Sequence, residues 1–300
     1  LVLRVRSSGA VTIGWPAVWA AAVLPYRVLG LSLSPDVAFG FAAAISLLAN
    51  VVTIAATFLL GLWTTGRREI GLLAAALVSV SPLLVLLLGE TRDAGTWGVD
   101  LGLYAYSEPL STALVAAGCA LVVRAERDPA TAVAAGALLG FAVTVRLSNA
   151  LVAVVAVAVL LLRRSRTAAL YASAAGLAFL PVVIAYWPLG YPDLPPEQFP
   201  DDPFALEHAT RAWSDSIVWG LRSLVVLVPL ALLGALRLPC AWALLLAGWI
   251  GATALLYTFY SFTPLHPRFL FVALPAVYVL WSAGAVGIVD RLRTAAEHRG

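Results

Sequence analysis

The stretch GETRDAGTWGVDLGLYAYSEP, from Gly89 to Pro109, is polar and aromatic and lies between two long apolar runs. The runs on either side, residues 70–88 and 107–123, each approach the length of about 20 residues that a helix needs to span a bilayer. A polar segment between two such runs is typical of a loop at a membrane surface. We therefore expect any chemistry of this protein to lie near that loop.

The composition of the chain agrees with a membrane location. Hydrophobic residues make up 62% of the 300 residues and charged residues only 12%, and the mean hydropathy is +0.94. These values lie far from the balance of a soluble domain. The sequence therefore predicts an all-α, polytopic transmembrane bundle that forms a single domain over residues 1–300. It has no basic run long enough to follow a phosphate backbone, so no nucleic-acid partner is expected.

The apolar runs predict about nine spans and one interfacial helix. Residues 14–30, interrupted by Pro16 and Pro25, are assigned to an interfacial helix within an outer-face segment, 1–36. The runs 130–145 and 149–162 are interpreted as a hairpin, because one long helix would carry the arginines that follow it to the opposite side. Its only turn signal is the pair Ser148 and Asn149. The predicted spans are 37–63, 70–88, 107–123, 130–145, 149–162, 167–186, 217–236, 239–257 and 269–289.

The positions of the arginines predict the orientation of these spans. All 19 basic residues are Arg, and the spans place eleven of them on one side of the membrane and eight on or near the other. Because cytoplasmic turns are enriched in basic residues, the turns at Arg67, Arg124, Arg163 and Arg237 and a tail at 290–300 are predicted to face the cytoplasm. The loop at 89–106, a Pro-rich loop at 187–215 and the segment 258–267 then face outward. The expected location is the plasma membrane of a bacterium or an archaeon.

Charged residues near the outer surface are the candidates for function, since hydrocarbon penalises unpaired charge. From Pro129 to Arg146 a helix rises about 25 Å, against a hydrocarbon core of about 30 Å, so Arg146 should lie just beneath the headgroups. It either extends upward to the interface or binds an anion. Arg268, near His266, begins the last span at a similar depth in the membrane. It is interpreted either as an interface anchor or as a functional cation. Arg222 is interpreted as a structural partner of a loop acid.

The loop itself supplies the acidic candidates. Glu108 follows Ser107, a possible N-cap, and the helix dipole alone favours an acid in a first turn. The alternatives are a catalytic acid or base, or an acceptor for a hydroxyl group. Asp93 and Asp100 are further catalytic candidates, with solvated loop acids as the simpler interpretation. Aromatic residues that fit either an interfacial belt or a sugar-stacking platform are Trp97, Tyr104 and Tyr106.

Small residues and cysteines are interpreted as packing elements. The run GALLG, Gly136 to Gly140, has the spacing of small residues that allows two membrane helices to approach closely. Cys119 and Cys240 have neither a CxxC pattern nor histidine partners, so neither a disulfide nor a metal site is expected. No cluster of acids has clear cation-ligand spacing, and we expect neither a required metal nor a cofactor.

Four stretches together resemble the GT-C family of multi-spanning membrane glycosyltransferases. The family has an interfacial helix in its first outer loop, an acid and a Pro that open a span, a Gly-rich helix that ends in Arg, and an Arg-aromatic-Leu start to a Pro-containing last span. The matching stretches in this chain are GWPAVWAAAVLPYRVLG at 14–30, YSEPLSTAL at 106–114, GALLGFAVTVRLSNAL at 136–151 and HPRFLFVALPAVYVL at 266–280.

The resemblance implies that a sugar is transferred, with inversion, from a polyprenyl-phosphate carrier to an acceptor glycan, lipid or protein on the outer face of the membrane. Negative charge grows on the carrier phosphate as the glycosidic bond breaks, and fixed cations stabilise that state. Arg146, Arg268 and His266 would then bind the donor phosphate. The aromatic residues of the outer loop, Trp97, Tyr104 and Tyr106, would contact the sugar or the acceptor.

In that family the general base is an acid in the first outer loop. No acid precedes Asp36 here, and the sequence contains no Met. We therefore expect this chain to be a truncated copy whose principal base lies upstream, with Glu108, Asp93 and Asp100 as the remaining candidates. A transporter or channel is the alternative function, although those folds often carry internal repeats and interrupted helices near the midplane. A non-catalytic membrane scaffold is the other alternative.

Overall fold

The computed structural model describes residues 14–31, 34–88, 107–126, 128–163, 166–186, 205–211, 228–260 and 267–298. The elements in these ranges are helices, so the predicted all-α fold is confirmed for the described part of the chain. They are α1 (Gly14–Val28), α2 (Pro35–Thr65), α3 (Arg68–Leu88), α6 (Ser107–Ala125), α7 (Pro129–Val145), η1 (Leu147–Asn149), α8 (Ala150–Leu162), α9 (Ala168–Tyr186), α10 (Leu206–Arg211), α12 (Val228–Ala235), α13 (Cys240–Thr258), η5 (Pro267–Ala273) and α14 (Leu274–Glu297).

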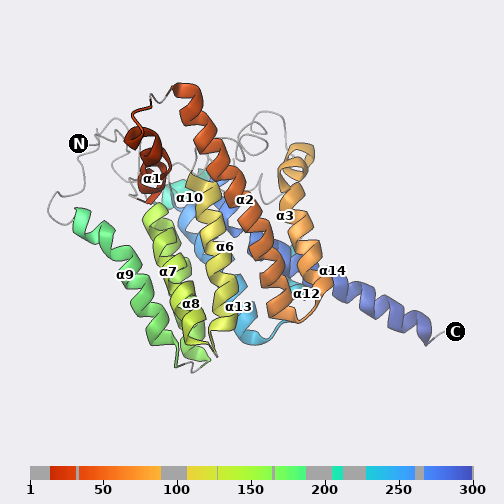
Figure 1. The fold of residues 1–300 in the computed structure, drawn as a ribbon. Coiled ribbons are helices and arrows are strands. Elements are labelled where there is room, and N and C mark those ends of the chain that lie inside the picture. Colours follow the sequence, from red (N-terminus) through yellow and green to blue (C-terminus); the bar gives the residue numbers. More distant parts are fainter. Residues whose placement is uncertain are drawn as a thin grey trace.

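These bounds follow the predicted spans closely, with two differences. Helix α1 continues through Pro25, although that Pro was expected to interrupt it. Helix α14 extends to Glu297, beyond the predicted end of the last span at residue 289, so part of the predicted tail is helical. The end of α14 projects beyond the bundle (Figure 1), where helical backbone hydrogen bonds continue without support from neighbouring helices. Residues 217–227 of one predicted span lie outside the described residues.

Four helical segments are long and apolar enough to cross a membrane: Gly40–Thr65, Ser107–Ala125, Cys240–Thr258 and Leu270–Glu297. Shorter apolar helices accompany them at Pro129–Val145, Leu147–Leu162 and Ala168–Pro181. Large hydrophobic side chains are exposed on several helices, for example Leu48, Val154 and Leu177. An apolar surface of this extent is unusual for a soluble protein and suits contact with lipid.

Local sequence signals begin and end the helices. At the start of α2 the Ser34 hydroxyl accepts a hydrogen bond from the backbone N–H of Val37 at 3.3 Å, and the Pro that follows fits the first turn. Gly66 ends α2 in the left-handed region, with φ of 71°, which glycine adopts without steric cost. Asp128 caps α7 by accepting from the N–H of Ala130 at 3.0 Å. The hairpin of α7 and α8 therefore begins at a defined residue.

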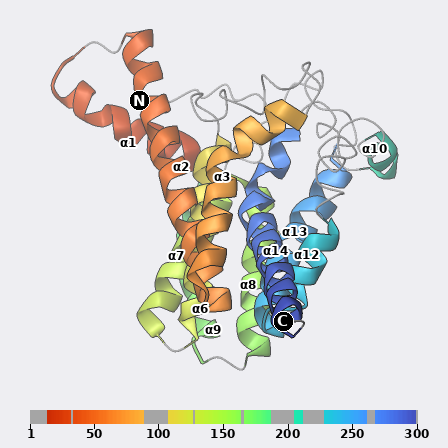
Figure 2. The ribbon, with the colours of Figure 1, turned by 90° about the vertical axis from the view of Figure 1, so that its right-hand side faces the viewer.

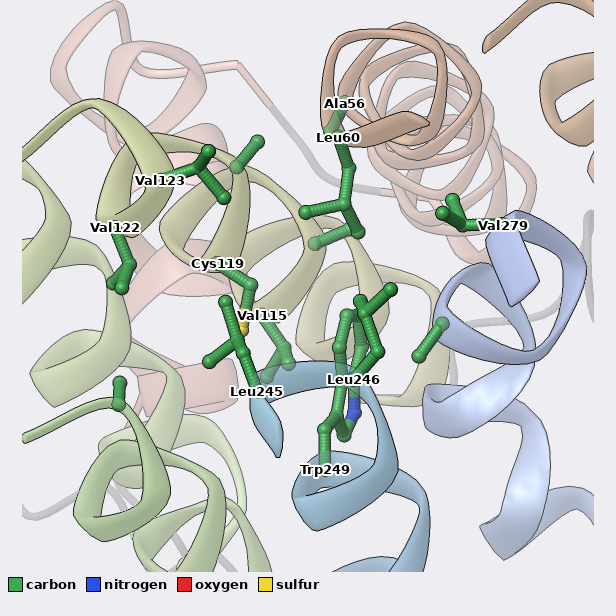
Figure 3. Packing of buried hydrophobic residues seen from close by; sticks show 14 of the residues in the cluster. Ala56, Leu60, Val115, Cys119, Val122, Val123, Leu245, Leu246, Trp249 and Val279 are labelled. Carbon is green, nitrogen blue, oxygen red and sulfur yellow. The ribbon is translucent and has the colours of Figure 1, made fainter. Parts of the chain in front are cut away.

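Helices α6 and α14 form the centre of the bundle. In each, 72% of the most apolar window is buried, against 33% in α2 and α13. Figure 3 shows Val115 and Cys119 of α6 packed near Leu245 and Trp249 of α13. Cys119 is fully buried, as predicted for a packing residue. The same prediction for Cys240 is wrong, because this residue is exposed at the first turn of α13.

The GALLG run packs closely against another helix, as its spacing predicted, and the structure identifies that helix as α9. A Cβ atom added to Gly136 would lie 2.3 Å from the carbonyl oxygen of Tyr171, and one added to Gly140 would lie 2.3 Å from that of Ala175. Both distances are far shorter than a real contact, so only glycine permits this approach. Helix α9 lies at the edge of the bundle and α7 separates it from α6 (Figure 1).

The arginine-rich turns gather at one end of the bundle. Arg67, between α2 and α3, pairs with Asp290 of α14 at 2.5 Å, and Arg163, after α8, pairs with Glu126, after α6, at 2.7 Å. The Arg124 guanidinium lies 4.9 Å from the ring centroid of Trp63, near the end of α2. The predicted grouping of these turns is thus confirmed, and we refer to this end as the arginine end.

Candidate functional site

The candidate site lies at the opposite end of the bundle from the arginine end. It is built from the first turn of α6, the turn between α7 and α8, and the end of α13. Helix α6 begins there with Ser107 and Glu108, whereas α7 ends there at Val145. Arg146 follows in an extended conformation, with φ of −149° and ψ of 118°. The backbone therefore leaves the helix at this residue and turns into η1.

Two residues that the sequence identified separately form an ion pair in this site. The Nη1 atom of Arg146 lies 2.8 Å from Oε1 of Glu108, and only 16% and 6% of these side chains are exposed. The Arg146 guanidinium therefore turns toward α6 and lies buried against Glu108. A charge in such a buried place requires a partner. Each of these residues supplies the other's counter-charge.

The turn that carries Arg146 is fixed to α6 and to the end of α7. Asn149, which is buried, donates from Nδ2 to the Ser111 hydroxyl and to the carbonyl oxygen of Ala142, both at 2.8 Å. The backbone N–H of Arg146 donates to that same Ala142 carbonyl at 2.9 Å. The sequence reasoning used Asn149 only as a turn signal. Its amide in fact satisfies buried polar groups that a turn inside a membrane protein would otherwise leave unpaired.

Two tyrosines at the end of α13, Tyr257 in its last turn and Tyr260 just after the helix, complete the polar cluster. The hydroxyl groups of Tyr257 and Ser148 are 2.8 Å apart, and the ring of Tyr260 packs edge-on against that of Tyr257 with centroids 6.0 Å apart. The Tyr257 hydroxyl thereby contacts the turn that carries Arg146. Burial raises the pKa of Tyr260, Tyr257 raises it further, and Arg146 lowers it. The Tyr260 hydroxyl therefore stays protonated at neutral pH and can donate a hydrogen bond.

Sequence reasoning did not identify Ser111, Ser148, Tyr257 or Tyr260 as site residues. The signal for the tyrosines was available, because Tyr257 and Tyr260 end an apolar run on the side where Arg146 was placed. We refer to the group as the Arg146 cluster. Its members are Glu108, Ser111, Arg146, Ser148, Asn149, Tyr257 and Tyr260.

An apolar pocket of about 400 Å³ lies on the helix ends that carry this cluster. Leu151 of α8 and Leu255, Leu256 and Phe259 of the α13 end line one side. Ala205 and Leu206, at the start of α10, line the other. The backbone N–H of Ala205 donates to the Phe259 carbonyl at 3.2 Å, which holds α10 against the end of α13 (Figure 2). A polar cluster and an apolar pocket therefore share the same two helix ends.

The side chains of the remaining predicted site residues lie outside the described part of the structure. Arg268 lies in η5, which packs against α6 and α13, but its side chain is outside the described part of the structure. Also outside the described residues are Asp93, Trp97, Asp100, Tyr104, Tyr106, Arg222 and His266. Among the described residues, no group of three or more His, Cys, Asp and Glu could hold a metal ion.

Comparison with known proteins adds no family assignment. No protein-family model matches the chain, and no curated protein matches its sequence. The function must therefore be argued from the helices, the buried ion pair and its neighbours.

Proposed function

We propose that this protein is a multi-pass membrane glycosyltransferase that moves a sugar from a polyprenyl-phosphate carrier to an acceptor on the outer face of the membrane. In this proposal about nine helices span the bilayer, α1 lies in the interface, and the arginine end faces the cytoplasm. The observation that carries it is the buried Arg146–Glu108 pair at the other end, with the Tyr257 hydroxyl bonded to Ser148 in the turn that carries Arg146. The motif resemblance supplies the reaction class.

The proposed role of Arg146 is to stabilise the carrier phosphate as the glycosidic bond breaks. The bonding electrons go to the phosphate oxygen, so negative charge grows there, and a cation fixed beforehand stabilises this state more than the ground state. A guanidinium carries five N–H donors in a planar fork. The Nη1 atom of Arg146 lies 2.8 Å from Oε1 of Glu108, and the proposal requires the carboxylate and the phosphate to share the guanidinium. Glu108 is thereby assigned to orienting Arg146, not to removing the acceptor proton.

The apolar pocket supports the same substrate class. A lipid-linked donor is an amphiphile, with an anionic phosphate next to a long hydrocarbon chain. The Arg146 cluster and the pocket lined by Leu256 and Phe259 present the two matching surfaces on adjacent residues of α13. A soluble nucleotide-sugar donor would have no use for the pocket. A polar cluster next to an apolar pocket therefore favours a lipid-linked donor.

The proposal is tested by a transfer assay in membranes that contain the complete gene product. Polyprenyl-phosphate sugars carrying a radiolabel serve as donors, and incorporation into acceptor is measured for wild type, Arg146→Ala and Arg146→Lys. We expect Arg146→Ala to lower transfer by about 10²-fold or more, the scale of losing one preorganised charge-stabilising group. Lys should restore it only in part, because the fork geometry is lost.

The control is Arg163→Ala, which removes an arginine from an ion pair at the arginine end and should leave transfer within about twofold, since surface pairs contribute little. Normal transfer by Arg146→Ala at normal expression would remove Arg146 from the site. Labelled sugar that crosses the membrane without being attached to an acceptor would instead favour a transporter.

A further inference from the structure

Arg146 lies in a turn whose position is set by neighbouring helices. Its backbone is extended, so no continuous helical hydrogen-bond ladder passes through this residue from α7 to α8. The turn is attached to α6 through Asn149, which donates to Ser111. It is attached to α13 through Ser148, which bonds to Tyr257. These two side-chain bonds fix the turn between two helices.

We infer that Tyr257 is a positioning residue that acts through Ser148 to hold the Arg146 guanidinium in the direction of an anionic phosphate. The inference rests on the proposed function, in which Arg146 binds the phosphate of a lipid-linked donor. Ser148 is two residues from Arg146, and its hydroxyl lies 2.8 Å from that of Tyr257. Loss of this hydrogen bond would therefore shift the backbone of the turn and, two residues away, the position of the Arg146 guanidinium.

The burial of Tyr257 supports a specific purpose for its hydroxyl group. The residue is only 4% exposed, and its neighbours along α13, Leu255 and Leu256, are hydrophobic. A phenylalanine would bury the same ring without the cost of taking a hydroxyl out of water. Buried tyrosine hydroxyls find a partner, and Tyr257 finds one in the turn that carries the central cation of the site. Packing of the ring alone does not explain why a tyrosine, and not a phenylalanine, occupies this position.

Tyr171 offers a matched comparison within the same chain. It is also buried, and its hydroxyl donates to the carbonyl oxygen of Ala153 at 3.2 Å. That bond joins α9 to α8 and involves no member of the Arg146 cluster. Loss of either hydroxyl removes one buried tyrosine hydrogen bond. Only loss of the Tyr257 hydroxyl is expected to change the direction of Arg146.

The experiment measures how tightly purified, complete gene product binds polyprenyl phosphate and the uncharged polyprenol. Tyr257→Phe should weaken polyprenyl phosphate binding about tenfold, a modest cost for a misplaced charged group, and leave polyprenol binding within about twofold. Ser148→Ala should do the same, and the double variant should be no worse than either single one, because both remove one shared bond. Tyr171→Phe should leave both affinities unchanged.

The outcomes separate the inference from the proposed function. Equal weakening of both ligands by Tyr257→Phe, or no more weakening than with Tyr171→Phe, overturns the positioning role. Independent, additive losses from Ser148→Ala and Tyr257→Phe also overturn it. If the expected binding pattern appears but no labelled sugar is transferred in the membrane assay, the positioning role stands and glycosyl transfer is rejected.

Discussion

At the scale of single residues, the Arg146–Glu108 pair shows what sequence reasoning reached and where it stopped. The position of Arg146 at the end of α7 and of Glu108 at the start of α6 followed from the apolar runs and from capping rules. Their contact did not, because they are 38 positions apart and meet only through the packing of α6 on α7. Pairing across helices depends on the rotation of each helix, which apolar runs without a polar face do not specify.

The burial of this pair predicts an unequal effect on stability. Arg146→Met leaves the Glu108 carboxylate without its counter-charge, at a cost of about 3–5 kcal/mol, whereas replacing both partners by apolar residues costs far less. We therefore expect the double variant Arg146→Met, Glu108→Leu to recover most of the stability lost by Arg146→Met alone. Equilibrium unfolding in mixed detergent micelles measures these free energies.

The pair at the arginine end is the control for this measurement. Arg163 and Glu126 are 39% and 27% exposed, so Arg163→Met should cost no more than about 1 kcal/mol. Burial would not determine how much stability the loss of a pair costs if the double variant were as unstable as Arg146→Met. The same conclusion would follow if Arg163→Met lost as much stability as Arg146→Met.

At the scale of helices, the hairpin of α7 and α8 was predicted from the arginines that follow it and from Ser148 and Asn149 as its only turn signal. The arginines that follow residue 162 required a turn near Ser148 and Asn149, and the structure turns there. The sequence could not reveal how the turn is held, since its partners come from α6 and α13. The GALLG run predicted close packing of α7, but only the structure identifies α9 as the partner.

The contact between α7 and α9 predicts which glycines resist substitution. The Cβ atom in Gly140→Ala would meet backbone atoms of Ala175, the nearest at 2.3 Å, so the two helices must separate, at a cost of about 1–3 kcal/mol. Gly176→Ala, in α9 itself, places its Cβ in open space and should be neutral or slightly stabilising. Unfolding midpoints of the two variants in the same detergent check this. Equal midpoints would contradict the close approach.

At the scale of the whole molecule, much of the fold was readable because membrane helices are constrained by length and charge. Apolar runs of about 20 residues must span, and arginines collect at one end. The structure confirms the helical fold and the grouping of the arginine-rich turns. The site was only half predictable: its ionisable pair stood out in an apolar sequence, whereas its tyrosines and serines resembled ordinary helix-end residues.

The predicted orientation can be measured with a thiol that the protein already carries. Cys240 is exposed at the arginine end and should react with a membrane-impermeant thiol reagent only after cells are lysed. Glu207→Cys, at the exposed face of α10 near the other end, should react in intact cells when Cys240 is replaced by Ser. Cys119 is fully buried and should stay unlabelled. The reverse pattern would place the Arg146 cluster in the cytoplasm.

The central claim is that the buried Arg146–Glu108 end of the bundle receives the phosphate of a lipid-linked sugar donor. Binding of polyprenyl phosphate to the purified, complete gene product, with Arg146→Ala and Arg163→Ala side by side, tests it most directly. We predict that Arg146→Ala weakens binding at least about tenfold, the scale of a lost charge-assisted contact, while Arg163→Ala binds as wild type does. Equal affinity of wild type and Arg146→Ala for polyprenyl phosphate would contradict the claim.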